Sequence, residues 1–344
     1  MKNSLRILLL CVLISFDSPA QQLEWQARLF SFFDNEEFGH SLVQIPQTMA
    51  GVRFSPGVNI RFDSVHSINT GINMLHEFGS VRVIDNISPT AYYMYDSNPV
   101  RFVAGAFPRD IALDRYPRIF FTDSIRYYRP NMNGLLVDYS VKNLSANLWL
   151  DWTSRQSPEN REAFFVGFSG QYKRGIFYIS QFTYMFHFAG KMNPVVDEAL
   201  HDNIMMLTSL GLDLSGKSFF DRLEINAGYV TGLDRARADN TGWMVHNGFL
   251  SEAVIEYRRF GIFNTFYTGD GQMSFYEDHS SELYWGDPFY RTNTYNRSDL
   301  YLDFLRNDLV NARLYFSFHF TERNVYNEQA LRVSVNLNNI RLKH

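Results

Sequence analysis

The segment Leu309–Ile340 limits the possible folds most strongly, because apolar and polar residues alternate along it in two runs. The apolar positions of the first run are Val310, Ala312, Leu314, Phe316, Phe318 and Phe320. Those of the second run are Leu331, Val333, Val335 and Leu337. A period of two places all apolar side chains of a strand on one face and all polar side chains on the other. We therefore expect a hairpin of two-faced strands, joined by a polar connection at Thr321–Gln329.

The same alternation recurs along almost the whole chain. The further runs that we expect to form strands are Trp25–Phe33, Val52–Phe62, Ile68–Phe78, Thr90–Tyr95, Pro99–Ala106, Leu135–Val141, Leu144–Trp152, Phe164–Tyr172, Ile176–Phe186, Ile204–Leu214, Leu223–Val230, Phe249–Tyr257, Ile262–Tyr267 and Leu300–Phe304. Pro56-Gly57 interrupts the second of them, where we expect a bulge or kink. About sixteen runs of about ten residues are typical of strands with lipid outside and water inside.

The connections between these runs alternate between short and long. The short ones are Asp63–Ser67, Asp96–Asn98, Lys142-Asn143, Lys173–Gly175, Ser215–Arg222, Arg258–Gly261 and Arg306–Asp308. The long ones are Asp34–Gln47, Gly79–Ser88, Phe107–Asn133, Asp151–Glu162, His187–Asn203, Thr231–Gly242, Gly269–Arg297 and Thr321–Gln329. Outer-membrane barrels have short periplasmic turns and long extracellular loops. A secreted soluble β-protein is the alternative, but it does not require this asymmetry.

The N-terminus has the pattern of a secretory signal peptide over residues 1–20. Lys2 and Arg6 precede an apolar stretch, and Ser18-Pro19-Ala20 forms a small-residue cleavage site. The single cysteine, Cys11, lies within this segment, so the mature chain, residues 21–344, has no disulfide.

Charge and hydropathy exclude two classes of protein. Removing Lys2, Arg6 and Asp17 from the 32 basic and 36 acidic residues leaves 30 and 35, which argues against nucleic acid as a partner. The mature chain has no apolar run of about 18 residues, so we expect no transmembrane helix.

These features together resemble the porin-like outer-membrane β-barrels of Gram-negative bacteria. The high content of aromatic residues, with 31 Phe and 20 Tyr, is similar to uncharacterised barrels of Bacteroidota. One departure is the C-terminus, Arg341-Leu342-Lys343-His344, where such barrels commonly end on an aromatic residue. The resemblance implies an all-β, antiparallel, up-and-down transmembrane barrel of about sixteen strands, within a range of about 14 to 18.

Charged residues on the polar faces suggest a lumen with two walls of opposite charge. The basic wall comprises Arg28, Arg53, Arg61, Arg101, Arg313 and Arg332. The acidic wall comprises Asp213, Glu224, Glu252, Glu256 and Asp303. Such segregation would create a transverse field that acts on permeating solutes. Local ion pairing along the wall is the alternative.

Two long loops contain further candidate residues. Phe107–Asn133 contains Arg109, Arg115, Arg118, Arg126 and Arg129. In position and charge it resembles the third loop of general porins, which folds into the lumen and narrows it, and an extracellular lid is the alternative. Gly269–Arg297 contains Asp270, Glu277, Asp278, Glu282 and Asp287 among aromatic residues, which could bind Ca²⁺ or glycan, although the spacing does not fit an EF-hand.

Signals for catalysis are weak. His279-Ser280 and His187 are the candidates for a lipid hydrolase, but the His-x-Ser-Asn-Gly pattern of outer-membrane phospholipases is absent.

We therefore expect a passive pore for small polar solutes that is not an enzyme, with no cofactor, no metal and outer-membrane lipid as its surroundings. It could form a homo-oligomer or join a membrane complex. A structural or surface-binding subunit is the second hypothesis, and a lipid-modifying enzyme is the third. A serine within hydrogen-bond reach of a histidine at the lipid boundary would favour the third.

Overall fold

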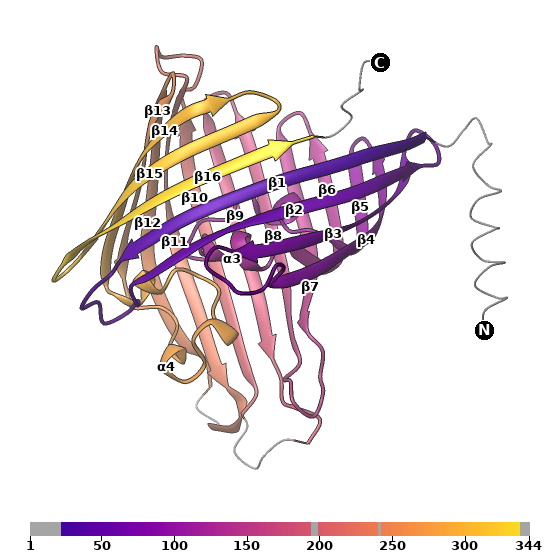
Figure 1. Cartoon of the computed structure of the whole chain (residues 1–344). Helices are drawn as coiled ribbons and strands as arrows, with labels where there is room; N and C mark the ends of the chain where they lie inside the picture. The colour runs from indigo at the N-terminus through magenta and orange to yellow at the C-terminus, as the bar shows by residue number, and fades with distance from the viewer. Residues whose placement is uncertain (1–21, 194–198, 240–241, 338–344) are drawn as a thin grey trace.

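The computed structural model describes residues 22–193, 199–239 and 242–337. In it the chain closes into a barrel of sixteen antiparallel strands (Figure 1), which confirms the predicted class and strand number. The strands are β1 (Gln22–Glu37), β2 (Gln47–Arg61), β3 (His66–Glu77), β4 (Asn86–Ser97), β5 (Val100–Pro108), β6 (Asn131–Val141), β7 (Leu144–Ser154), β8 (Ala163–Arg174), β9 (Phe177–Phe188), β10 (His201–Asp213), β11 (Arg222–Ala236), β12 (Met244–Tyr257), β13 (Phe260–Gly269), β14 (Thr294–Arg306), β15 (Val310–Thr321) and β16 (Val325–Asn336). The expected signal peptide, Cys11 and the C-terminal residues Arg341–His344 lie outside the described residues.

Each strand pairs with its neighbours in sequence, and β1 pairs with β16 to close the barrel, with Leu29 opposite Val335. One local prediction was wrong. The expected polar connection Thr321–Gln329 is mostly strand, because β16 already begins at Val325 and turns Glu328 inward, where it is buried. At Pro56-Gly57 the register of β2 against β1 continues without a shift, whereas the pairing of β2 with β3 is interrupted at Ser55 and Pro56, since Pro56 has no N–H to donate to the ladder.

The two ends of the barrel differ as the connections predict. The chain ends of β1 and β16 lie at the end with short turns, and the long loops gather at the other end (Figure 1). Helices α2 (Asp110–Leu113) and α3 (Ser124–Tyr128) belong to the loop between β5 and β6, and α4 (Tyr276–His279) to the loop between β13 and β14. Single-turn 3-10 helices are η2 (Arg237–Asp239), η3 (Ser280–Glu282) and η4 (Pro288–Arg291). None of the described helices is long and apolar enough to cross a membrane.

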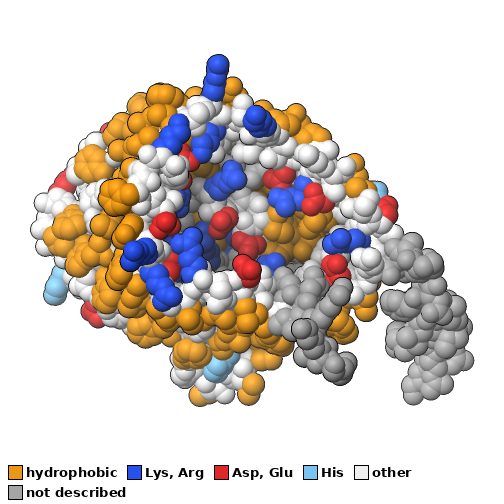
Figure 2. Space-filling view, turned by 90° about the horizontal axis from the view of Figure 1, so that it is seen from above, with side chains coloured by type: hydrophobic (Ala, Val, Ile, Leu, Met, Phe, Trp, Pro, Cys, Tyr) orange, Lys and Arg blue, Asp and Glu red, His pale blue; other side chains and the backbone are white. Residues whose placement is uncertain are grey.

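The strands have an apolar outer face and a mixed inner face. On the outside, Leu148 is 55% exposed and Leu210 is 68% exposed. Seen from the short-turn end (Figure 2), hydrophobic side chains surround a hollow whose lining carries Lys, Arg, Asp and Glu side chains. Lipid on the outside and water on the inside account for this arrangement.

The half of the lumen nearer the long loops is filled by protein. Residues 109–130 and 270–293 fold inward and pack against the barrel wall in one buried cluster. Its largest loop members are Tyr116, Phe120, Phe121, Tyr284, Trp285, Phe289 and Tyr290. They contact wall residues from β5 through β16, including Val103, Trp149, Phe165, Tyr184 and Tyr326. The hollow at the short-turn end therefore stops at an aromatic plug.

Candidate functional site

An exposed serine and a histidine meet at the long-loop end of the barrel. Ser274 lies in the loop between β13 and β14, and His246 lies on the inner face of β12, close to the start of the strand. The Ser274 Oγ is 2.6 Å from the His246 Nε2. The His246 side chain is 21% exposed, so a molecule outside the barrel can reach this pair. A serine hydroxyl hydrogen-bonded to an imidazole is the basic arrangement of a nucleophile with its general base.

Asp234 on β11 anchors both residues of the pair. Its Oδ2 accepts a hydrogen bond from the Ser274 backbone N–H at 3.2 Å and lies 3.9 Å from the His246 Nε2. Its Oδ1 accepts from the Tyr284 hydroxyl at 2.8 Å and from the Asn203 amide at 2.9 Å. Asp234 is only 1% exposed. Because it approaches the same imidazole nitrogen as the serine, Asp234 positions the serine loop and adds negative charge beside the histidine.

Tyr284 donates a hydrogen bond to the buried Asp234 carboxylate. Burial and the neighbouring Asp234 raise the pKa of Tyr284, so its phenol stays protonated and acts as a donor. A buried carboxylate with several donors is fixed in place, and the backbone that it binds is fixed with it.

The backbone next to Ser274 is held in an unusual conformation. Met273 has a φ of +66°, in the left-handed region that side chains other than glycine rarely adopt, and its side chain is 4% exposed in the plug. Gly232 on β11 permits the approach of the neighbouring Gln272, since a Cβ at Gly232 would lie 2.1 Å from the Gln272 Oε1. Such strain clusters at functional sites, which agrees with a functional serine at the next position.

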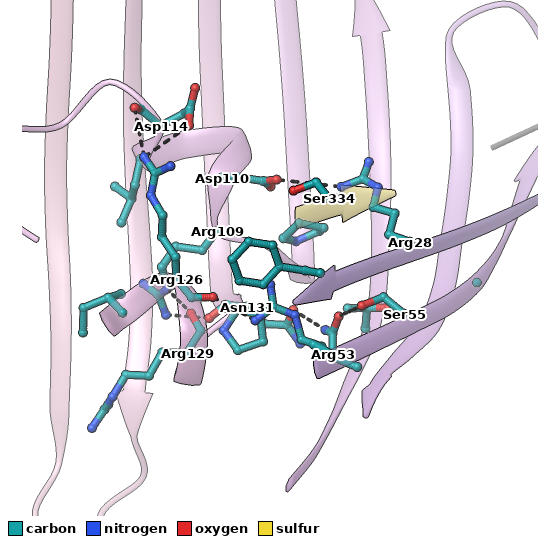
Figure 3. A pocket seen from close by; sticks show the side chains of 18 of the residues that line it. Arg28, Arg53, Ser55, Arg109, Asp110, Asp114, Arg126, Arg129, Asn131 and Ser334 are labelled. Carbon is teal, nitrogen blue, oxygen red and sulfur yellow. Dashed lines mark hydrogen bonds and ion pairs between the residues drawn. The ribbon is translucent and has the colours of Figure 1, made fainter. Parts of the chain in front are cut away.

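Seven of the residues predicted for the basic and acidic walls line two cavities. A cavity of about 560 Å³ is lined by Arg28 and Arg53, and Figure 3 shows their side chains with Arg109, Arg126 and Arg129 from the infolded loop. A second, of about 630 Å³, is lined by Asp213, Glu224, Glu252, Arg313 and Arg332.

Many of these charges have a nearby partner of opposite sign. Arg101 binds Asp138 at 2.5 Å, and Arg313 binds Asp303 at 2.5 Å. Arg61 lies 3.4 Å from Glu24, and Glu256 lies 3.7 Å from Arg306. Local pairing of this kind weakens a long-range transverse field.

The five arginines predicted in the third loop lie inside the barrel, and four of them contact its wall or the second plug loop. Arg109 pairs with Asp151 at 2.5 Å, Arg115 donates to the Ser145 Oγ at 3.1 Å, and Arg118 pairs with Asp299 at 2.8 Å. Arg126 lies 3.3 Å from Asp114 of its own loop, and Arg129 lies over the Trp285 ring at 4.4 Å.

Asp123, just before α3, lies at the centre of this charge network. Burial alone would raise the pKa of Asp123, but Arg118, Arg332 and Arg297 hold it well below its ordinary value. The arginines of the loop and of the wall thus stabilise the plug by pairing with Asp123.

The other sequence candidates have different surroundings. The His279 Nε2 lies 3.3 Å from the His201 Nε2, and the His187 Nδ1 lies 2.7 Å from the Asp202 Oδ1. The acidic residues of the loop Gly269–Arg297 are dispersed, with Asp270 accepting from the Asn247 N–H and Glu277 pairing with Arg291.

A different set of carboxylates could hold a cation. Among the described residues, Asp34, Glu36 and Glu328 have ligand oxygens within 4.8 Å of one another on the inner face of β1 and β16. The Tyr127 hydroxyl donates to Asp34, and Arg297 pairs with Glu328 at 3.1 Å. These contacts already compensate part of the negative charge.

Fold and surface together define an outer-membrane β-barrel. Similar solved structures are a loop L8 deletion mutant of OmpT from Vibrio cholerae (TM-score 0.57, 9% identity, 92% of this chain and 99% of that one) and OccK11 (OpdR) from Pseudomonas aeruginosa (TM-score 0.54, 10% identity, 92% and 96%). A triple mutant of the Rhodopseudomonas blastica porin is also similar (TM-score 0.51, 10% identity, 92% and 100%). At these identities the likeness shows the fold alone. No curated protein matches the chain in sequence.

The family is more specific than the fold. Residues 15–341 match the family model described as Lipid A 3'-O-deacylase-type, and the chain belongs to this family. Two predictions from the sequence are thereby corrected, because the family is an enzyme type: the passive pore and the absence of enzymatic activity are both wrong. The lipid-modifying hypothesis, ranked third from the sequence, agrees best with this finding.

Sequence reasoning did not find the serine and histidine that lie together. It singled out His279-Ser280 because they are adjacent in sequence, whereas Ser274 and His246 are 28 residues apart. The sequence analysis began this strand at Phe249. Because β12 begins at Met244, His246 belongs to the strand, and its side chain points to the inner face.

Proposed function

We propose that the protein is exported by its N-terminal signal peptide to the outer membrane and there removes an ester-linked acyl chain from lipid A. The observation that carries the assignment of the site is the 2.6 Å contact between the Ser274 Oγ and the His246 Nε2. It supports hydrolysis because a serine lies within hydrogen-bond reach of a histidine at the rim of the barrel, in a chain of a deacylase-type family.

The reaction follows from the roles of the two side chains. His246 Nε2 accepts the hydroxyl proton while the Ser274 Oγ attacks the carbonyl carbon of the acyl ester. The ester bond breaks, and the sugar oxygen leaves with the proton returned by His246. Water then attacks the acyl-serine with His246 again as base, which releases the fatty acid and restores the serine. Asp234 is a positioning residue, since it binds the Ser274 N–H.

The position of the pair suits a lipid of the outer leaflet. Ser274 is exposed at the end of the barrel that carries the long loops, which is the extracellular end of such barrels. The acyl esters of lipid A lie where its sugar headgroup meets the hydrocarbon, close to the rim of a barrel. Ser274 belongs to the plug formed by residues 109–130 and 270–293, and the buried cluster of this plug supports the serine from the side of the lumen.

The test uses the purified full-length protein in mixed vesicles with lipid A, with mass spectrometry to follow loss of one acyl chain. We expect Ser274→Ala and His246→Ala each to lower the rate by about 10³-fold or more. Ser280→Ala, in the same loop, is the matched control and should retain activity. Full activity in Ser274→Ala would remove this residue as the nucleophile, and failure of the unaltered protein to release fatty acid would overturn the proposed function.

A further inference from the structure

A second cluster of charged residues lies on the opposite surface of the same wall. Asp202 on β10 is 2% exposed and is surrounded by Arg235 on β11, Arg237 in η2 and His187 on β9. Arg235 Nη2 donates to the Asp202 Oδ2 at 2.5 Å, Arg237 Nε donates to the same oxygen at 2.8 Å, and the His187 Nδ1 lies 2.7 Å from the Oδ1. The register pairs Asp202 with His187 on one side and with Arg235 on the other.

This cluster faces outward. In β11 the side chains of Gly232 and Asp234 belong to the inner face, so Arg235 points to the outside, and Asp202 and His187 lie in the same row across the strands. Arg235 and Arg237 remain 32% and 46% exposed. These two guanidinium groups and one carboxylate together carry a net positive charge.

Asp202 holds the guanidinium groups of Arg235 and Arg237 in place but contacts only some of their N–H donors. Asp202 contacts the Nε and Nη2 atoms of both Arg235 and Arg237. A guanidinium has five N–H donors, and within the described parts of the chain no contact of Asp202 involves the Nη1 atoms. Arg235 also lies over the Trp243 ring at 4.3 Å, which fixes its plane. These donors can therefore bind a second anion with little further loss of side-chain freedom.

The surroundings of the cluster indicate the kind of anion. Trp152, Phe164 and His187 follow one another around the outside of the barrel, with ring centroids 4.9 Å and 5.1 Å apart. Aromatic residues of this kind mark the membrane interface. Further from the extracellular end, the outer faces of β10 and β11 carry exposed apolar side chains: Leu210, Ile225 and Tyr229. A ligand that fits this surface has an anionic headgroup and hydrocarbon chains.

We propose that Arg235 and Arg237 bind a phosphate group of a phosphorylated lipid of the outer leaflet, with Asp202 holding both guanidinium groups in place. The acyl chains of that lipid lie along the apolar wall of β10 and β11. The identification of the lipid as lipid A rests on the proposed function. Because Asp234 and Arg235 are consecutive, the phosphate site and the serine site lie on the two faces of one strand, which presents bound lipid to the rim beside Ser274.

The test measures binding separately from hydrolysis, in the Ser274→Ala background. The protein in phosphatidylcholine nanodiscs is titrated with bisphosphorylated lipid A, with the same lipid after dephosphorylation, and with inorganic phosphate as competitor. We expect the phosphorylated lipid to bind about tenfold or more tightly than the dephosphorylated one, with a preference that weakens at high salt. Competition by millimolar phosphate would assign the site to phosphate itself, with the lipid wall adding nothing, and would overturn the lipid part of the proposal.

The variant Arg235→Gln/Arg237→Gln should lose this preference. Arg82→Gln/Arg323→Gln is the matched control, because both residues are exposed in extracellular loops, and it should keep the preference. Arg237→Lys retains the charge and should bind with intermediate affinity. Unchanged preference in the double variant, with its barrel folded by heat-modifiable electrophoresis, would overturn the proposal. Binding without hydrolysis by the unaltered protein would keep this inference and remove the proposed function.

Discussion

The Ser274 Oγ lies 2.6 Å from the His246 Nε2, and the two residues belong to segments that meet only because the loop between β13 and β14 folds back onto β12. This loop can lie against β11 and β12 because a glycine on the wall, Gly232, leaves room for the buried side chain of Gln272. Gly232 pairs with His246 across β11 and β12, and it faces the side chain of Gln272, two residues before Ser274.

Gly232→Val should therefore move the serine without unfolding the barrel. Any Cβ at this position would lie 2.1 Å from the Gln272 Oε1, and Gln272 cannot easily yield because it is 3% exposed and donates to the Tyr267 hydroxyl at 2.7 Å. We expect at least a tenfold loss of acyl release, since a displacement of about 1 Å can cost that much or more. Gly39→Ala, where a Cβ meets nothing within 4 Å, is the control. Equal activity in both variants would contradict the role given to this contact.

Arg297→Gln should destabilise the folded barrel. The Arg297 side chain is 6% exposed and pairs with Asp299 at 2.7 Å and Glu328 at 3.1 Å, with Asp123 and Asp287 within 4.0 Å. Removing one partner of a buried ion pair costs about 3–5 kcal/mol, because the carboxylates are left without compensation. The measurement is urea unfolding in lipid vesicles, and exposed Arg323→Gln should change the free energy of unfolding little. A loss below 1 kcal/mol would mean that the network does not hold the plug.

The outer and inner faces of the strands should respond differently to a new charge. Leu210→Arg places a guanidinium on the lipid side of β10 and should cost about 2–4 kcal/mol near the midplane. Gln171→Arg, on the inner face of β8 beside the cavity of about 630 Å³, should be tolerated because water is available there. Folding yield into vesicles and urea midpoints report the difference. Equal damage from the two substitutions would be inconsistent with the two-faced wall.

The loop that contains Ser274 should become less stable at low pH, because His279 in the same loop becomes protonated. Burial and the nearby Arg161 lower the pKa of His279 below its ordinary value of 6.5, although Asp278 and Glu282 act in the opposite direction, and His201 lies 3.3 Å away. The native state then binds fewer protons than the unfolded state, so this stabilisation is present above pH of about 6.5 and is lost as the pH falls through the lowered pKa. Hydrogen exchange of residues 270–293 at pH 7.5 and pH 5 measures it. His279→Gln should remove the pH dependence, and an unchanged profile in this variant would assign it to another group.

The sequence by itself determined the architecture of this protein. Alternation of apolar and polar residues is a local property with a period of two, so Val310–Phe320 and Leu144–Trp152 already show which face meets lipid. The order of short and long connections, also local, predicts which end of the barrel is extracellular. Sixteen closed strands follow from these two patterns, as the structure confirms.

Only the tertiary structure decided the contents of the lumen and the position of the candidate site. Whether Phe107–Asn133 forms a plug or a lid depends on contacts with distant wall residues, such as the pair Arg118 and Asp299. The meeting of Ser274 with His246, and of Asp202 with Arg235, depends on strand register and on how a long loop folds. The register of a strand is determined by many weak pairings along its whole length. The conformation of a long loop is determined by contacts with side chains that are far away in sequence. Neither can therefore be derived from the residues next to the site.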